Sequence, residues 1–136
     1  MPIVTDDGFT RDATPTPLLS LAALESGGGD APCALEVAND TDARHLVPHF
    51  ASVELIAVTF PDFADGRGFS LARRLRALGY RGRLRAKGHV IADQYPMARA
   101  CGFDEVEIAD DLAARQPEAH WVATASLRGH ALQVRR

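Results

Sequence analysis

Apolar residues recur along the chain in two alternating patterns: short runs typical of strands, and spaced stripes typical of helices. The clearest run is Val53 to Phe60, which is rich in β-branched residues and is apolar on both faces after Glu54. Such a run is typical of a central strand that is covered on both sides. Shorter runs predict three more strands, at 34–37, 83–86 and 106–108.

Between these runs the apolar residues return at helical spacing. Leu71 and Leu75 lie on one stripe, which predicts a helix over 70–78 that ends at Gly79. Pro96 predicts a kink or a break in the helix expected over 91–101, because proline removes a backbone donor and clashes with the preceding turn. Besides the helix over 70–78, three helices are expected, at 43–50, 91–101 and 110–115.

The alternation of strands and helices favours parallel pairing through crossover connections. We therefore expect an α/β fold: a mainly parallel sheet of four or five strands with helices packed on it, as an open sandwich or a partial barrel-like sheet. Residues 33–136 are expected to form a single α/β domain. Residues 1–32, which contain two prolines and a Gly-Gly-Gly joint, are interpreted as a flexible N-terminal arm. The tail predicts a last strand or hairpin, at 121–123 and 131–134.

Composition excludes several classes of protein. The chain has 136 residues, 46% of them hydrophobic, and a net charge of −3, which argues against global disorder. Two unpaired cysteines argue against a disulfide framework or a metal cluster, and no metal site is expected because Pro48 interrupts the only histidine pair at helical spacing, His45 and His49. No apolar run reaches the ~20 residues of a membrane helix, and no secretory signal is visible, so we expect a cytoplasmic protein.

The basic residues are concentrated in one segment. Eight of the 15 lie between Gly66 and Lys87, a stretch without Asp or Glu. This bias predicts an anion site or a patch that faces an acidic partner. The alternative is an arginine-rich helix that acidic neighbours balance in space. Nucleic-acid binding is not expected, because the sequence pI is about 5.9 and few aromatic residues interleave with the arginines.

Two glycine-containing loops follow predicted strands and precede predicted helices: Gly66-Arg67-Gly68 and Lys87-Gly88-His89. In open parallel sheets ligands bind beyond the carboxyl ends of the strands, so we expect these loops to form one anion-binding pocket. In the alternative interpretation, the glycines only shape turns and Asp65 only pairs with Arg67. The candidate anion-binding residues are Asp65, Gly66, Arg67, Gly68, Ser70, Lys87, Gly88, His89 and Asp93.

The arginines of the helix predicted over 70–78, and those just after it, predict a docking face. The leucine stripe of this helix would hold it against the sheet and leave its arginines outward, where they could meet an acidic protein. The candidate partner-binding residues are Arg73, Arg74, Arg76 and Arg81. Cys101 is expected to be a small buried apolar residue.

Several strings of the sequence together closely resemble one bacterial family, the domain of unknown function 934. They are FPDFADGRGFSLAR at 60–73, GYRGRLRA at 79–86, GHV at 88–90, DQ at 93–94 and CGFD at 101–104. The resemblance covers residues 34–115. Two positions depart from it: His89 stands where an acidic residue is usual, and Tyr95-Pro96 where an apolar pair is usual.

Members of this family are often labelled oxidoreductases of sulfite reduction, but the resemblance implies no catalytic residue. It implies an accessory protein of assimilatory sulfite reduction that binds sulfite reductase, or another acidic protein of the pathway, or helps to deliver an anion. No flavin, cluster or haem motif is present, so no cofactor is expected and an enzymatic role stays open. The alternatives are a small enzyme acting on a sulfur or phosphate compound and an anion-sensing module. Homo-oligomer formation also stays open.

Overall fold

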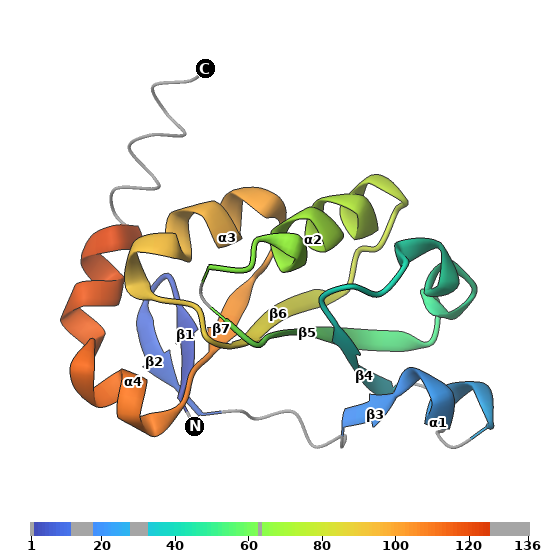
Figure 1. The fold of residues 1–136 in the computed structure, drawn as a ribbon, viewed down its shortest axis with the longest axis horizontal. Coiled ribbons are helices and arrows are strands. Elements are labelled where there is room, and N and C mark those ends of the chain that lie inside the picture. Colours follow the sequence, from blue (N-terminus) through green and yellow to red (C-terminus); the bar gives the residue numbers. More distant parts are fainter. Residues whose placement is uncertain (1, 12–17, 28–32, 63, 126–136) are drawn as a thin grey trace.

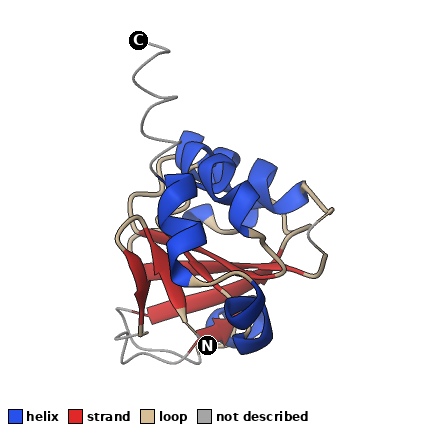
Figure 2. Ribbon diagram, turned by 90° about the vertical axis from the view of Figure 1, so that its left-hand side faces the viewer, coloured by secondary structure: helices blue, strands red, loops and turns tan. Residues whose placement is uncertain are grey.

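The computed structural model describes residues 2–11, 18–27, 33–62 and 64–125. They form an α/β fold in which one mixed sheet carries most of the helices over one face (Figure 1, Figure 2). The predicted fold class is confirmed, and the sheet is mainly parallel. The predicted number of strands is wrong, because the sheet has seven strands rather than four or five.

The strand order across the sheet is β2-β1-β7-β6-β5-β4-β3. Five of the strands are parallel and neighbour each other in chain order, so their carboxyl ends meet at one edge. These strands are β3 (Leu18–Ser20), β4 (Cys33–Ala38), β5 (Val53–Phe60), β6 (Arg83–Gly88) and β7 (Glu105–Glu107). A hairpin of β1 (Ile3–Thr5) and β2 (Gly8–Thr10) adds to β7 in the antiparallel sense. The run over Val53 to Phe60 is internal, as predicted.

The crossover helices lie side by side on the sheet. α2 (Arg67–Ala77) connects β5 to β6, and α3 (Tyr95–Cys101) connects β6 to β7. Both connections step in the same direction across the sheet, so right-handed crossovers place both helices over the same face, as Figure 1 shows. The remaining helical segments are α1 (Leu21–Glu25), α4 (Asp110–Arg115), residues 118–125 and three short 3₁₀ helices, η1 (Ala43–His45), η2 (Val47–His49) and η3 (Ala92–Gln94).

Prolines account for two differences from the predicted helices. The helix expected over 43–50 is instead the pair η1 and η2, with Pro48 in the first turn of η2. The helix expected over 91–101 is divided into η3 and α3, and Pro96 stands in the first turn of α3. The first turn tolerates proline because its backbone N–H groups have no partner within the helix. The break predicted at Pro96 is therefore confirmed.

The two ends of the described chain differ from the sequence interpretation. Residues before 28 contribute β1, β2, β3 and α1, so the described part of the expected arm belongs to the sheet. The strand expected at 121–123 is wrong, because residues 118–125 are helical. Trp121 is buried, stands edge-on to the Tyr95 ring and donates its indole N–H to the Gln116 carbonyl at 2.8 Å. The strand expected at 131–134 lies outside the described residues.

The face of the sheet beneath α2 and α3 is apolar. Leu35, Ile56 and Leu84 are in register on three neighbouring strands and fully buried. The side chain of Leu75 on α2 belongs to the same hydrophobic core. Gly68, in the first turn of α2, lies so close to β5 that a Cβ there would overlap the Phe60 ring. The start of α2 is thereby fixed against the carboxyl end of β5.

The opposite face carries a network of charged side chains. Because side chains alternate along a strand, the residues between the apolar ones of β6 point to this face. Arg85 is fully buried and donates to Glu105 at 2.7 Å and to Glu107 at 3.1 Å. We call this set the charged face; its ionised members are Glu36, Arg83, Arg85, Lys87, Glu105 and Glu107. Much of the basic segment is thus balanced by acidic neighbours in space.

Candidate functional site

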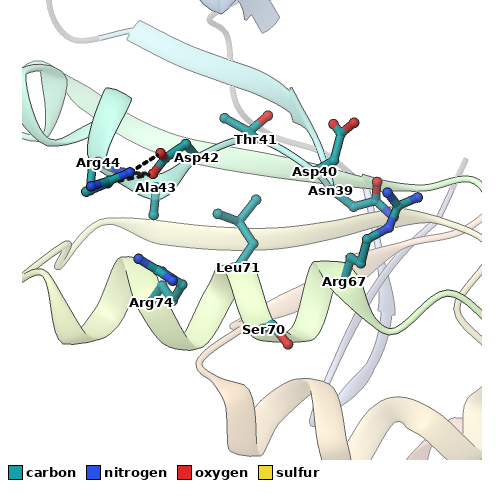
Figure 3. A pocket seen from close by; sticks show the side chains of 10 residues that line it. All are labelled: Asn39, Asp40, Thr41, Asp42, Ala43, Arg44, Arg67, Ser70, Leu71 and Arg74. Atoms are coloured by element: carbon teal, nitrogen blue, oxygen red, sulfur yellow. Dashed lines mark hydrogen bonds and ion pairs between the residues drawn. The ribbon is translucent and has the colours of Figure 1, made fainter.

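A polar pocket of about 370 Å³ opens at the carboxyl edge of the sheet, between the segment that follows β4 and one side of α2. Residues 39–44 form one wall, and Arg67, Ser70, Leu71 and Arg74 contribute from α2 (Figure 3). We call it the α2 pocket. Its position agrees with the rule that ligands of parallel sheets bind beyond the carboxyl ends of the strands.

Asp42 and Arg44 shape one end of the α2 pocket. The Asp42 carboxylate accepts the Arg44 backbone N–H at 3.0 Å, which caps η1, and also binds the Arg44 guanidinium at 2.8 Å. The hydrogen bonds from Arg44 hold the pKa of Asp42 well below its usual range. The positive charge of Arg44 is therefore largely balanced by its own neighbour.

Asp65 and Arg67 form a similar pair at the other end. Asp65 accepts the Arg67 backbone N–H at 3.1 Å and the guanidinium at 2.7 Å. These hydrogen bonds, with a smaller contribution from the Asn39 side chain, hold the pKa of Asp65 well below its usual range. The hydrogen bond with Asp65 raises the pKa of Arg67, and the negative charge of Asp40 adds to that rise. The pairing considered as the alternative interpretation of Asp65 is present.

In the α2 pocket, the Asn39 amide nitrogen and the Arg74 guanidinium make no hydrogen bond within the described residues, although Asn39 lies near Asp65. Asn39 is only 6% exposed, and its Nδ2 donates no hydrogen bond within the described chain. Arg74 is exposed, and within the described chain its side chain makes no ion pair or hydrogen bond. Figure 3 shows Leu71 between Arg67 and Arg74 on the side of α2 that faces residues 39–44. Buried donors in proteins are normally satisfied, so the Asn39 amide is an exception that points to a bound acceptor, whereas the exposed Arg74 guanidinium is free to bind an anion from solvent.

The predicted anion site is not one pocket. Arg67 and Ser70 line the α2 pocket, Asp65 pairs with Arg67, and Gly66 and Gly68 begin α2. The residues expected from the next loop lie elsewhere. Lys87 binds Glu36 at 2.5 Å on the charged face, and Asp93 lies 3.6 Å from the His120 ring. The alternation of side chains along β6 explains Lys87, because that position points away from the helices.

Gly88 and His89 line a second pocket of about 330 Å³, together with residues from the β7–α4 connection and from α4. Gly88 has a φ of +115°, and a Cβ there would lie 2.7 Å from the Phe60 carbonyl oxygen, so its role in the turn is steric. The acidic and basic residues of this pocket, Asp111 and Arg115, lie 3.5 Å apart and are exposed to solvent. This pocket therefore offers less fixed chemistry than the α2 pocket.

The candidate partner-binding arginines have different surroundings. Arg76 donates to the carbonyls of Tyr80 and Gly102, both at 2.9 Å, and forms an ion pair with Asp104. Arg73 donates to the Cys101 sulfur at 3.2 Å, and Cys101 is buried as expected. Arg76 therefore ties the end of α2 to the loop after α3. Arg74 and Arg81 are exposed.

Sequence reasoning missed the wall formed by residues 39–44. None of the candidate residues predicted from the sequence lies in this wall, and its Asp42 caps η1. This wall could have been found with the signal that was used for the two glycine-containing loops, which is the position of a segment directly after a predicted strand. A polar stretch directly after a parallel strand lies at the edge where ligands bind.

Within the described residues, no group of three or more metal-ligating side chains comes together, and no helix is long and apolar enough to cross a bilayer. The fold and the pocket define a two-layer α/β domain with an arginine-lined polar pocket at the carboxyl edge of its parallel strands. The family model described as a bacterial protein of unknown function (DUF934) matches residues 34–127. The chain belongs to this family. No curated protein matches the sequence.

Proposed function

We propose that the protein is an accessory of assimilatory sulfite reduction that binds a small oxyanion in the α2 pocket. One observation carries the binding proposal: the Arg74 guanidinium faces a pocket in which it has no described acidic partner, and the buried Asn39 amide in the same pocket also lacks an acceptor. Both groups are hydrogen-bond donors. An oxyanion bound at Arg74 supplies the acceptors that its guanidinium lacks.

The charge balance of the pocket makes Arg74 the decisive residue. Arg44 and Arg67 are each paired with an aspartate, so their attraction for an incoming anion is reduced. Arg74 can offer its planar fork of N–H groups to two oxygens of one anion. A hydrogen bond to a charged group contributes about 1.5–3 kcal/mol, which corresponds to roughly a 10- to 150-fold change in affinity.

The hydroxyl groups of the pocket favour binding over catalysis. Thr41 and Ser70 line it, and neither makes a hydrogen bond with another side chain in the described part of the chain. A nucleophilic hydroxyl needs a base within hydrogen-bond distance. The small enzyme and the anion sensor are alternatives that would use the same pocket. An enzyme with a hydroxyl nucleophile needs such a base, whereas an accessory protein or a sensor does not.

The place in sulfite reduction rests on the family resemblance. Sulfite and sulfate present the oxygen acceptors that a guanidinium binds, which is compatible with that resemblance. Docking on sulfite reductase stays part of the proposal. Its candidate contacts are Arg74 and Arg81, because Arg76 is engaged inside the domain and Arg73 contacts Cys101.

Calorimetry with Arg74→Gln tests the binding site. The wild-type protein is titrated with sulfite, sulfate and phosphate at low and high salt, beside Arg74→Gln and the control Arg81→Gln. Arg81 is exposed and does not line the pocket. We expect Arg74→Gln to weaken binding at least tenfold and Arg81→Gln to leave it within twofold. Absence of binding to all three anions, or equal effects of both variants, would overturn the proposal.

A growth experiment tests the pathway separately. A strain that lacks the protein is expected to grow poorly on sulfate or sulfite as the sole sulfur source, and normally on cysteine. Co-purification with sulfite reductase should weaken as the salt concentration rises, since salt screens exposed charges beyond about 10 Å at 0.1 M. Normal growth on sulfate would contradict the pathway assignment and leave the binding site to be judged by calorimetry.

A further inference from the structure

The α2 pocket is larger than an inorganic oxyanion requires. Its volume of about 370 Å³ equals the space of roughly twelve liquid waters at about 30 Å³ each. Arg67 and Arg74 are seven residues apart on α2, which at 1.5 Å per residue separates them by about 10 Å along the helix axis. An inorganic anion bound to Arg74 would therefore leave the Arg67 end of the pocket unfilled.

The two ends of the pocket differ in chemistry. The Arg74 end presents a guanidinium without a described partner. At the Arg67 end lie the Nδ2 donor of Asn39 and the exposed carboxylate of Asp40, which makes no ion pair closer than 4 Å within the described residues. A carboxylate accepts hydrogen bonds and repels anions, so the negative charge of a ligand belongs at the Arg74 end. The Arg67 end suits groups that both donate and accept.

The middle of the pocket is apolar. Leu71 lies between the two arginines (Figure 3), and both Leu71 and Ala43 are almost fully buried. Neither side chain can bind a charged or hydroxyl group. They suit the carbon frame of a ligand that reaches from one polar end to the other, and pockets of this size commonly hold small organic molecules.

We infer, on the basis of the proposed function, that the ligand is an organic anion of sugar-phosphate size whose hydroxyl groups lie far from its charge. The phosphate or sulfate group binds Arg74. The carbon frame lies over Leu71 and Ala43. Hydroxyl groups donate to the Asp40 carboxylate and accept from the Asn39 amide, so the donor that is unpaired in the described chain gains its acceptor.

Asn39 also lies near the Asp65 carboxylate, so the test must separate a structural role of Asn39 from ligand binding. Its side chain contributes to lowering the pKa of Asp65, so it lies near that carboxylate, although Nδ2 makes no hydrogen bond with it. If Asn39 only supports Asp65, its loss should not change the preference among ligands. If it binds the ligand, Asn39→Ala should reduce affinity for hydroxylated anions more than for inorganic phosphate.

The experiment compares ligands that share one anionic group. Wild-type protein is titrated with phosphate, butyl phosphate and ribose 5-phosphate, and with glucose 6-phosphate beside glucose 6-sulfate to identify the anionic group. We expect ribose 5-phosphate to bind at least ten times more tightly than phosphate or butyl phosphate. Asp40→Ala and Asn39→Ala should each remove most of this preference. The matched control is Glu25→Ala, which removes an exposed carboxylate on α1. Thermal unfolding verifies that each variant is folded.

The outcomes separate this inference from the proposed function. If phosphate binds through Arg74 but ribose 5-phosphate binds no better, the inference is overturned and the oxyanion site stands. The same holds if the preference survives in both Asp40→Ala and Asn39→Ala. If none of the anions binds, or if Arg74→Gln changes nothing, the proposed function itself fails. Both are supported if Arg74→Gln weakens the binding of every anion at least tenfold and Asp40→Ala removes the preference for ribose 5-phosphate over phosphate.

Discussion

The two faces of the sheet are buried with different kinds of side chain. On the face beneath α2 and α3, Leu35, Ile56 and Leu84 are in register across three strands. One residue further along each strand, Glu36, Ala57 and Arg85 are in register on the charged face, and Arg85 is as completely buried as Leu84. One strand, β6, therefore contributes both to the hydrophobic core and to a buried ion-pair network.

This difference changes the meaning of the basic segment. Arginines that alternate with Leu84 and Ala86 resemble a surface patch in the sequence, but their guanidinium groups bind carboxylates of the neighbouring strand β7. The alternation also fixes register. A slip of β6 by one residue would move Arg85 into the hydrophobic core and Leu84 onto the charged face. The charged face thus determines how β6 pairs, and few basic residues remain for a ligand or partner.

The largest effect is expected at Arg85. Arg85→Met leaves Glu107 and Glu105 buried with less compensation, and removing one partner of a buried ion pair costs about 3–5 kcal/mol. Urea unfolding measures this loss. Arg81→Met is the control, because exposed substitutions change stability by within about 0.5 kcal/mol. A loss below about 1 kcal/mol for Arg85→Met would show that the network is not a structural requirement.

Neighbouring residues of β5 compare the faces directly. Ile56 belongs to the hydrophobic core, whereas Leu55 is buried on the charged face at 1% exposure. Ile56→Ala and Leu55→Ala should each reduce the free energy of unfolding by about 2–5 kcal/mol. Chemical denaturation of both variants measures it. A large loss for Ile56→Ala with almost none for Leu55→Ala would mean that side chains on the charged face are loosely packed.

Tyr80 predicts a loss of stability at alkaline pH. Burial raises the pKa of Tyr80 above its ordinary value of about 10, and its hydroxyl donates to the Val53 carbonyl at 3.0 Å. The folded state therefore holds the proton more tightly than the unfolded state. This stabilisation is complete below pH 10 and is lost as the pH rises further. Tyr80→Phe should cost about 0.5–1.5 kcal/mol at pH 7 and flatten the decline between pH 10 and 11.

That decline is measured as the free energy of unfolding across the alkaline range. Tyr95→Phe is the comparison, because Tyr95 is also buried but donates to the side chain of Asp6. An equal decline in wild type and Tyr80→Phe would show that other groups are responsible.

The smallest effect is expected from the pair of Asp65 and Arg67 at the α2 pocket, in which the Arg67 side chain is exposed. Hydrogen bonds from Arg67 hold the pKa of Asp65 below its usual range, so the pair stabilises the fold above the ordinary aspartate pKa of about 4 and is lost as the pH falls below it. Asp65→Asn should remove this acid dependence, and high salt should weaken it in the wild type. Unfolding between pH 5 and 2 at two salt concentrations measures both. Salt-insensitive stability would indicate that the pair behaves like the buried charged face.

The elements that could be predicted carry their signal locally. The β-branched run of β5, the leucine stripe of α2 and the glycine at the end of each crossover helix all act within a few residues. The three-residue strands β1, β2 and β3 are too short to show a period, and they depend on partners far away in the sequence. Residues 118–125 form a helix because Trp121 packs on Tyr95, a contact that no local pattern indicates.

The candidate site was predictable in part for the same reason. The pairing of Asp65 with Arg67 spans two residues and follows from the loop. The approach of Asn39 and Asp40 to α2 depends on which strands are neighbours, and the sequence does not state that order. Lys87 was placed in the pocket because the loop was considered without the alternation of side chains along β6.

The strand order bears on synthesis as well as on stability. Each of the four strands from β3 to β6 pairs with the next one to be made, so the growing chain can extend the sheet as it emerges. The first hairpin cannot join in that order, since Ile3 pairs with Glu107, roughly a hundred residues later. Until β7 has left the ribosome, β1 and β2 lack their neighbour and the most recent strand remains an open edge. The interval before β7 is made is therefore when the nascent chain is most exposed to chaperones and to aggregation.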